Sequence, residues 1–431
     1  MIVSKEPYQK IPDQIIQIMP EWKIQWIYDP KTSKSNNKRI IGFKLLTDNT
    51  MKIEYFGDNI IMMTLKDYFS KQIFQLNFLD EYEIIKKIGK GKYAKVYKVR
   101  RKIDNKPFAV KYLHKNKLAT IEDANDALFN ELTILRSLDN KYCIKVISTY
   151  EDDNGYYILI ELLDFEKIFQ NELINLKNYK LGYEYQKLVM KQLLIGVLYV
   201  HNNGIMHRDL KPQNLMFATE PEDGQPYQVK IIDFGLAQYV KAKKYIYVHV
   251  GTPGFVAPEI LNNESENNRY TEKCDLFSIG VIMHIMLTGK QLFPGKRFSQ
   301  VLESNKKCLT DFTHQRYQDI SEEAIDLMKR LLEVNPFKRL SAEEALNHEF
   351  FQTEGTLIKK EINLYNQEDF TPLNVKAPKI EVHHNLNQIE NKDKKDIDDF
   401  KIDFDDLGFK MIHMMPLEEI SILGRHIGIT Y

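Results

Sequence analysis

Cysteine is scarce in this chain. The 431 residues contain three cysteines, Cys143, Cys274 and Cys308, at wide spacings. An odd number of distant cysteines excludes a disulfide framework of the kind that staples small secreted domains, and the spacings match no zinc site. The sequence therefore predicts a protein of a reducing compartment, and we expect a cytoplasmic location.

The chain also has no long apolar run. The longest candidate, residues 279–287 (IGVIMHIML), contains His284, and a membrane-spanning helix would need roughly 18 apolar residues. A buried helix is the favoured interpretation of this segment. The first residues, MIVSKEPYQKIPDQ, contain no apolar core of a signal peptide. We therefore expect neither a membrane span nor a secretory signal.

Neither sign of charge is in excess. Lys and Arg together number 60, and Asp and Glu together also number 60. This balance excludes an overall field that would draw the chain onto nucleic acid or an anionic membrane, so we expect no nucleic-acid partner. The hydrophobic fraction of 43% is sufficient for a core. The length exceeds that of one ordinary domain, so two or three units are expected.

Residues 1–80 have no glycine-rich motif and a pattern typical of β-structure. Strands are predicted over 22–29, 39–47 and 51–57, and a helix-like apolar pattern follows over 59–76. This order of strands and helix resembles the closing half of a pleckstrin-homology domain. Two interpretations stay open: an extension packed on the next domain, or a pleckstrin-homology-like module.

Four basic residues lie in or beside the loop between the first two predicted strands: Lys31, Lys34, Lys38 and Arg39. In a pleckstrin-homology-like module they would contact a phosphoinositide headgroup, which predicts a weak attachment to a membrane surface through residues 1–80. In a plain extension they form a solvated loop.

The last part of the chain is acidic. Residues 390–406 contain seven Asp, one Glu and four Lys, so we expect residues 352–431 to form an acidic, largely disordered tail. An EF-hand is excluded, because a frame that starts at Asp403 puts Leu407 and Met414 where calcium needs oxygen ligands.

The motifs lie in residues 82–351. Alternating patterns predict antiparallel strands in the first part, and helical patterns such as 185–204 follow in the second. Residues 88–96, IGKGKYAKV, predict a turn between two strands whose glycines let the backbone approach a phosphate. Lys111 ends an apolar strand, and Glu131 on a predicted helix is its expected partner.

Three further motifs follow. Residues 205–217, IMHRDLKPQNLMF, place a dense group of charged and amide side chains between apolar shoulders. Asp233 follows an apolar strand, where a carboxylate can bind Mg²⁺ together with phosphates. The segment GTPGFVAPE ends at Glu259, and Arg339 far downstream is its expected ion-pair partner.

In order, the motifs are G-x-G-x-x-A-x-V, V-K, a helical Glu, H-R-D-L-K-P-Q-N, D-F-G and A-P-E. Residues 82–351 thereby resemble the eukaryotic protein kinase family. The resemblance implies an α+β, bilobal fold with a small antiparallel-β lobe that holds one main helix, and a large, mostly helical lobe. It also implies transfer of the γ-phosphate of ATP to protein substrates with Mg²⁺. We expect a monomer.

The resemblance assigns roles residue by residue. Asp209 is the expected catalytic base, and Lys211 is expected to neutralise the transferring phosphoryl group. Asn214 and Asp233 are the expected metal ligands. The expected ATP-binding residues are Ile88, Gly89, Lys90, Gly91, Lys92, Tyr93, Ala94, Lys95, Val96, Ala109, Lys111, Glu131, Glu161, Leu163 and Met216.

The H-R-D-L-K form with Lys211 is typical of serine/threonine kinases. The segments GTPGF and NPFKRLSAEEALNHEFF are most similar to the calcium/calmodulin-dependent kinase group. Related kinases that recognise arginine in their substrates carry acidic residues at the positions where this chain has Lys167, Gln213 and Ile285. We therefore expect only a weak preference for basic substrates.

The activation segment, residues 233–259, has Thr252 as its only serine or threonine, and Val248 stands at the usual phosphoacceptor position. We expect this segment not to need phosphorylation. Two classes of function stay open: an active serine/threonine kinase, and a pseudokinase scaffold that binds ATP and partners without transfer. The enzyme is favoured, because every catalytic role has its residue.

Overall fold

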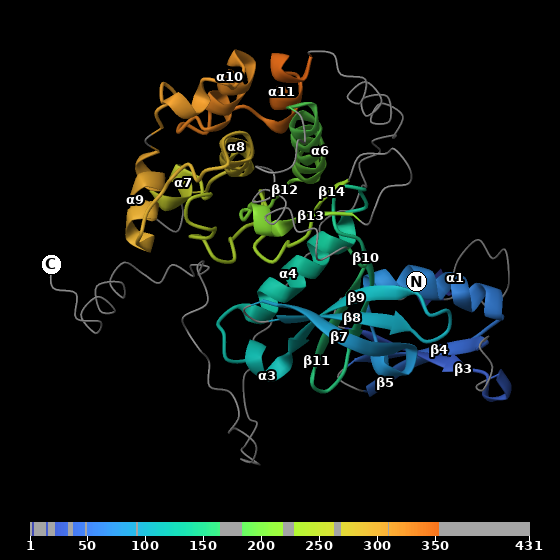
Figure 1. The fold of residues 1–431 in the computed structure, drawn as a ribbon. Helices are drawn as coiled ribbons and strands as arrows, with labels where there is room; N and C mark the ends of the chain where they lie inside the picture. The colour runs from blue at the N-terminus through green and yellow to red at the C-terminus, as the bar shows by residue number, and fades with distance from the viewer. Residues whose placement is uncertain are drawn as a thin grey trace.

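The chain forms a β-rich lobe and a helical lobe (Figure 1). The computed structural model describes residues 2–3, 14–15, 22–32, 38–47, 50–91, 94–163, 183–218, 228–262, 269–308 and 310–352. The tail expected from residue 352 onward lies outside these residues, apart from its first residue.

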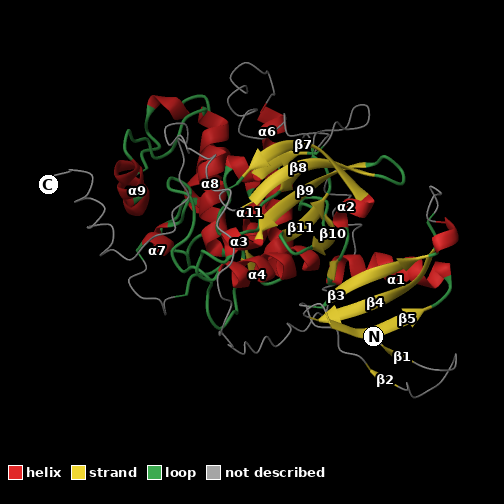
Figure 2. Cartoon of the chain, turned by 90° about the horizontal axis from the view of Figure 1, so that it is seen from below, coloured by secondary structure: helices red, strands yellow, loops and turns green. Residues whose placement is uncertain are grey.

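Nine strands of the β-rich lobe form one sheet, in the order β5-β4-β3-β6-β10-β11-β9-β8-β7 (Figure 2). Its strands are β3 (Lys23–Tyr28), β4 (Ile40–Thr47), β5 (Thr50–Phe56), β6 (Phe74–Gln75), β7 (Tyr82–Lys90), β8 (Ala94–Arg101), β9 (Pro107–His114), β10 (Val146–Glu151) and β11 (Gly155–Ile160). The helices of this lobe are α1 (Asn59–Gln72), α2 (Phe78–Glu81), α3 (Lys115–Leu118) and α4 (Ala124–Ser137), with the 3-10 turn η1 (Pro30–Thr32). A separate pair joins β1 (Ile2–Val3) and β2 (Gln14–Ile15).

The sheet runs across the border between residues 1–80 and 82–351. Strands β7 to β11 pair antiparallel, as the sequence predicts for the small lobe. The strands predicted before residue 60 are confirmed as β3, β4 and β5, which form an antiparallel meander. β6 joins the two parts because it pairs in parallel with β3 on one side and with β10 on the other.

The helix predicted over 59–76 is shorter than expected. α1 begins after Asp58, whose carboxylate accepts the N–H of Ile60 at 2.8 Å, and the helix ends at Gln72. Ile73 is extended, with φ −134° and ψ 161°, and β6 follows at once. Extended backbone lets β6 donate and accept hydrogen bonds on both sides, which helical backbone could not do.

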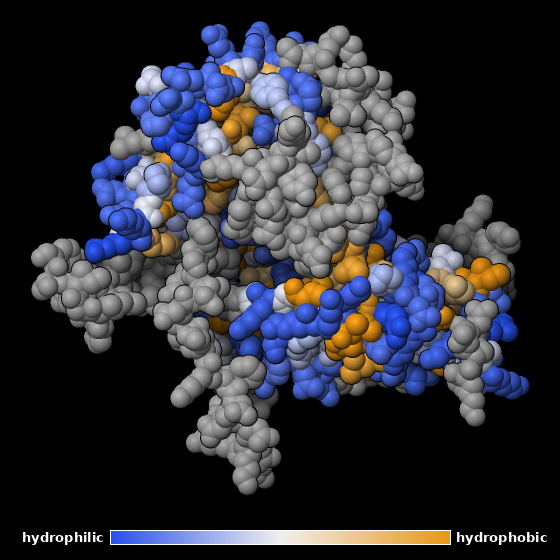
Figure 3. Space-filling model, in the orientation of Figure 1, coloured by the Kyte–Doolittle hydropathy of each residue, from blue (hydrophilic) through white to orange (hydrophobic). Residues whose placement is uncertain are grey.

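Apolar residues on both faces of α1 explain why the sequence pattern did not locate its end. Phe69 is buried against the sheet, whereas Ile60, Ile61 and Met63 are exposed. Figure 3 shows an apolar patch where α1 lies in Figure 1. The apolar residues of α1 therefore do not form one face, and the sequence pattern does not change at the residue where the helix ends.

The large lobe is built around two buried helices. Its elements are α6 (Tyr183–Asn202), β12 (Ile205–Met206), η3 (Pro212–Asn214), β13 (Leu215–Phe217), β14 (Val229–Ile231), β15 (Gln238–Tyr239), α7 (Pro258–Leu261), α8 (Lys273–Thr288), α9 (Phe298–Lys307), η4 (Gln315–Tyr317), α10 (Glu322–Leu331), α11 (Ala342–Leu346) and η5 (Glu349–Phe351). The segment predicted as a buried helix is confirmed as part of α8, in which His284 has no exposed surface. No helix among the described residues is long and apolar enough to cross a membrane.

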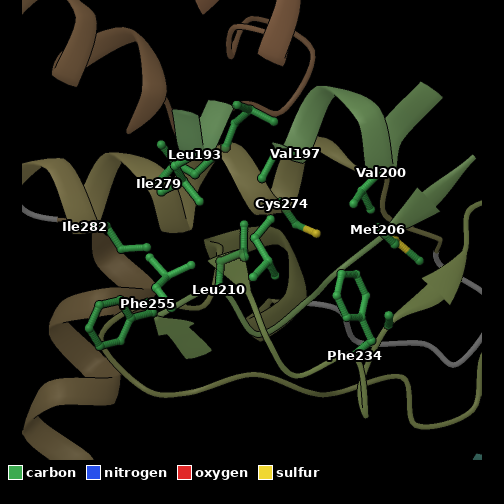
Figure 4. Packing of buried hydrophobic residues seen from close by; sticks show 14 of the residues in the cluster. Leu193, Val197, Val200, Met206, Leu210, Phe234, Phe255, Cys274, Ile279 and Ile282 are labelled. Carbon is green, nitrogen blue, oxygen red and sulfur yellow. The ribbon is translucent and has the colours of Figure 1, made fainter. Parts of the chain in front are cut away.

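The core of this lobe supports the loops that carry the motifs. Figure 4 shows side chains of α6, such as Leu193 and Val197, facing Ile279 of α8. Leu210, Phe234 and Phe255 pack into the same cluster from three loops. The three motif-bearing loops are therefore anchored by apolar residues in one shared core, which limits how far they move relative to each other.

Candidate active site

Asp209 is the centre of a hydrogen-bonded group between β12 and β13. Its Oδ1 accepts a hydrogen bond from Thr252 Oγ1 at 2.6 Å, and its Oδ2 lies 2.8 Å from Lys211 Nζ. Asn214 Nδ2 donates to Oδ2 at 3.0 Å, and Lys211 Nζ also donates to Thr252 Oγ1 at 2.7 Å. All four residues are buried, so these contacts fix the carboxylate in one orientation.

Asn214 and Asp233 are brought together by the short β13–β14 pair. The N–H of Ile232, which directly precedes Asp233, donates to the carbonyl oxygen of Asn214 at 3.0 Å. Asp233 Oδ1 accepts the N–H of Gly235 at 3.1 Å. A carboxylate and an amide oxygen are both ligands that Mg²⁺ accepts while sharing phosphate oxygens. The donor set at this place therefore fits the predicted metal.

Lys111 makes the ion pair predicted with Glu131. Its Nζ lies 2.5 Å from Glu131 Oε1 and 3.7 Å from Asp233 Oδ1. Burial alone would lower the pKa of Lys111, but the two carboxylates together raise that pKa above its ordinary value. Burial raises the pKa of Glu131, while the ammonium of Lys111 holds the pKa of Asp233 below its ordinary value against the effect of burial. The lysine is therefore charged at neutral pH, which suits the phosphate-binding role predicted for it.

The predicted ATP-binding residues lie on or beside the strands β7, β8, β9, β11 and β13, apart from Glu131 on α4. Ile88, Gly89 and Lys90 end β7, Ala94, Lys95 and Val96 begin β8, and Gly91 donates its N–H to the carbonyl oxygen of Ala94 at 2.8 Å. Lys92 and Tyr93 lie outside the described residues. Ala109 of β9 and Met216 of β13 are buried, and Glu161 and Leu163 follow β11.

The comparison with known proteins agrees with this geometry. A family model described as "Protein kinase domain" matches residues 82–351. The chain belongs to the protein kinase family. Its kinase domain is of the eukaryotic serine/threonine type, close to the calcium-dependent kinases among its relatives. A protein kinase domain uses ATP as its phosphoryl donor.

Three curated relatives show the extent of the similarity. "Calcium-dependent protein kinase 5" of Plasmodium falciparum is 32% identical over 77% of this chain and 59% of its own length. "Calcium-dependent protein kinase 3" of Plasmodium berghei is 35% identical over 66% of this chain and 50% of its own length. "Putative ribosomal protein S6 kinase alpha-1" of Caenorhabditis elegans is 32% identical over 70% of this chain and 37% of its own length. The chain thus spans roughly half the length of these relatives or less.

Asp275 orients the backbone of the loop that leads to Asp209, and this role was not predicted from the sequence. Its carboxylate accepts the backbone N–H groups of His207 and Arg208 at 2.7 and 2.8 Å, and it lies 2.9 Å from His201 Nε2. These bonds support Arg208 in the left-handed region, with φ of +69°. The sequence does contain a signal for this role. Asp275 is the one acidic residue in the apolar segment CDLFSIGVIMHIML, and a carboxylate buried there needs hydrogen-bond partners.

The ion pair predicted between Glu259 and Arg339 is present. Arg339 donates to both oxygens of Glu259, at 2.7 and 2.9 Å, and its guanidinium lies 5.2 Å from the ring centroid of Phe277. His207 also contacts Phe234, with ring centroids 5.0 Å apart and the rings tilted by 59°. Phe234 and Glu259 both belong to residues 233–259, so the two contacts join this segment to other parts of the large lobe.

Proposed function

We propose that this protein is an active serine/threonine kinase that transfers the γ-phosphate of ATP to hydroxyl groups of protein substrates. The observation that carries this proposal is the group around Asp209, in which Lys211, Thr252 and Asn214 all contact one carboxylate. A scaffold that only bound ATP would have no need of an oriented, buried carboxylate at this place.

In the proposed reaction, the substrate hydroxyl oxygen attacks the γ-phosphorus and the bond to the β-phosphate oxygen breaks. Asp209 accepts the hydroxyl proton, and Lys211 offsets the negative charge of the transferring group. Lys111, held by Glu131, binds the α and β phosphates. The protein thus contributes positioning and charge, which is what phosphoryl transfer requires.

Asn214 and Asp233 would hold Mg²⁺. The ion would neutralise charge on the phosphate oxygens. The ammonium of Lys111, 3.7 Å from Asp233 Oδ1, would keep that carboxylate deprotonated and ready to bind a cation.

Incubation of the purified chain with labelled ATP and a generic basic protein tests the proposal. We expect label on serine or threonine and none on tyrosine after acid hydrolysis. Retained ATP binding without any transfer would contradict the enzyme and favour the scaffold.

For the region before the kinase domain we propose a weak contact with phosphoinositides. Lys31, Lys38 and Arg39 are exposed, and Lys34 lies outside the described residues. Sedimentation of the full chain with phosphoinositide vesicles tests this, with Lys31→Glu/Lys38→Glu as the control pair. Equal sedimentation of both proteins would overturn it.

We also propose that the protein works in the cytoplasm as a monomer. The three cysteines are free and buried, as in proteins of a reducing compartment. Size-exclusion chromatography with light scattering tests the monomeric state.

A further inference from the structure

Phe74 belongs to the core of the kinase domain, although it precedes that domain in the chain. The strands β3 to β5 and α1 have a small core of their own, made of Ile24, Trp26, Ile40, Phe43, Leu45, Met62, Phe69 and Ile73. Phe74, the next residue, is fully buried in the large cluster that includes α4. The backbone step from Ile73 to Phe74 therefore leads from one core into the other.

The ring of Phe74 contacts the helix that carries Glu131. Its centroid lies 6.1 Å from that of Phe129 on α4, in an edge-to-face arrangement, and 5.2 Å from that of Tyr156 on β11. Phe129 and Tyr156 also contact each other, at 6.4 Å. Phe74 thus completes a group of three rings that joins α4 to the sheet.

Arg136 of α4 also contacts Phe74. Its guanidinium lies 5.4 Å from the ring centroid of Phe74, and its Nη2 donates to Thr149 Oγ1 at 2.7 Å. Thr149 Oγ1 in turn donates to the carbonyl oxygen of Ile73 at 3.3 Å. Arg136 Nε is buried and has no hydrogen-bond partner among the described residues. Because a buried cation is costly unless it is compensated, the ring and the hydroxyl stabilise Arg136 where it is.

The residues of α4 that contact Phe74 lie on the side of the helix opposite the ion pair between Glu131 and Lys111. Phe129 and Arg136 are seven residues apart and share one face, whereas Glu131 lies about 160° around the helix axis from Phe129. Glu131 contacts Lys111 on its own side at 2.5 Å. The helix is therefore held from two sides, by Lys111 and by Phe74.

The unit that supplies Phe74 is fixed to the kinase domain by charged groups as well. Lys23 of β3 lies 2.9 Å from Glu151 of β10. Glu81, at the end of α2, accepts hydrogen bonds from Lys66 of α1 at 2.6 Å and from Tyr150 of β10 at 3.1 Å. These partly buried pairs hold the strand unit at a fixed place relative to β10.

We propose that Phe74 is a positioning residue for the kinase reaction: the N-terminal strand unit holds α4 through Phe74 so that Glu131 stays on Lys111. This inference rests on the proposed kinase activity. The effect of Phe74 on catalysis then passes through Glu131 and through no contact of its own with ATP or substrate.

A double-mutant cycle tests the proposal in the full chain. Phe74→Ala, Glu131→Gln and the double variant are compared by kcat/KM for ATP and by Tm. Phe43→Ala is the matched control, because Phe43 is equally buried but packs on Trp26, Tyr55 and Phe69 within the N-terminal unit. Thr149→Val replaces Phe74→Ala if that variant does not fold, and Phe74→Leu measures rescue by an apolar side chain.

We expect Phe74→Ala to lower kcat/KM about tenfold or more, since ring and cation–π contacts are lost together. In the Glu131→Gln background the same substitution should change kcat/KM little, and Phe43→Ala should lower Tm while leaving kcat/KM within about twofold of wild type. Fully additive losses in the cycle, or an equal loss in Phe43→Ala, would overturn the proposal. An inactive wild type would instead refute the kinase activity itself.

Discussion

Arg208 Nη1 donates a hydrogen bond of 2.8 Å to the carbonyl oxygen of Tyr247 in the activation segment. Its Nη2 donates to the carbonyl oxygen of Ile246 at 2.9 Å, and its Nε donates to that of Leu236 at 2.6 Å. Tyr270 OH accepts a further hydrogen bond from Nη1 at 2.9 Å. Four of the five N–H groups with which Arg208 could bind a phosphate on this segment are therefore engaged by the protein itself.

From this we predict that the activation segment does not need phosphorylation. Val250 and Phe255 are buried, and Tyr247 OH donates to the carbonyl oxygen of Glu122 near the start of α4, so the segment is ordered by its own contacts. Protein made in bacteria, shown by mass spectrometry to be unmodified between residues 233 and 259, should turn over at its full rate. If it were inactive until a residue in that range was phosphorylated, the prediction would be wrong.

The second prediction concerns the substrate. Gln213 in η3 and Ile285 in α8 are half-buried and carry no carboxylate, and Lys167 lies outside the described residues. A peptide-library screen should therefore show only a weak preference for basic residues before the acceptor.

The variant Gln213→Glu supplies the contrast. It should increase selection for arginine about tenfold, because a charge-assisted hydrogen bond becomes available. A strong arginine requirement in the wild type would contradict the prediction.

The third prediction is a pH dependence of stability through His284. This side chain is buried in α8 beside Tyr317 OH, at 3.1 Å from Nδ1, and burial together with the nearby charge of Arg316 lowers its pKa to about 4. The unfolded chain binds a proton at His284 near pH 6.5, whereas the folded chain does not until about pH 4, so acidification favours unfolding. The free energy of unfolding should lose about 3 kcal/mol through this group between about pH 7 and pH 4.

Denaturant unfolding at several pH values checks this, with His284→Gln as the comparison. The loss on acidification should be smaller in the variant by about that amount. Parallel curves for the two proteins would exclude His284 as the source.

The kinase fold and most of the site could be predicted because their signals are local in sequence. Motifs of a few residues specify the turn at Gly91, the Asp209 loop and Asp233. Such signals need no knowledge of how distant segments pack.

The missed features depend on tertiary contacts. The end of α1 is set by β6, whose residues Phe74 and Gln75 pair with strands on either side, one of them more than 70 residues downstream. The role of Asp275 likewise depends on backbone N–H groups more than 60 residues away. The hydrophobic periodicity of a segment does not indicate which distant strand or N–H group it will contact.

Single-turnover phosphorylation with Lys111→Met and Asp233→Ala tests most directly whether Lys111 and Asp233 serve phosphoryl transfer. Each variant should keep the circular dichroism spectrum of the wild type while the rate of transfer falls by at least about 100-fold, the size expected when a preorganised charge is removed from such a site. A folded variant of either residue that transferred phosphate at the wild-type rate would contradict the account.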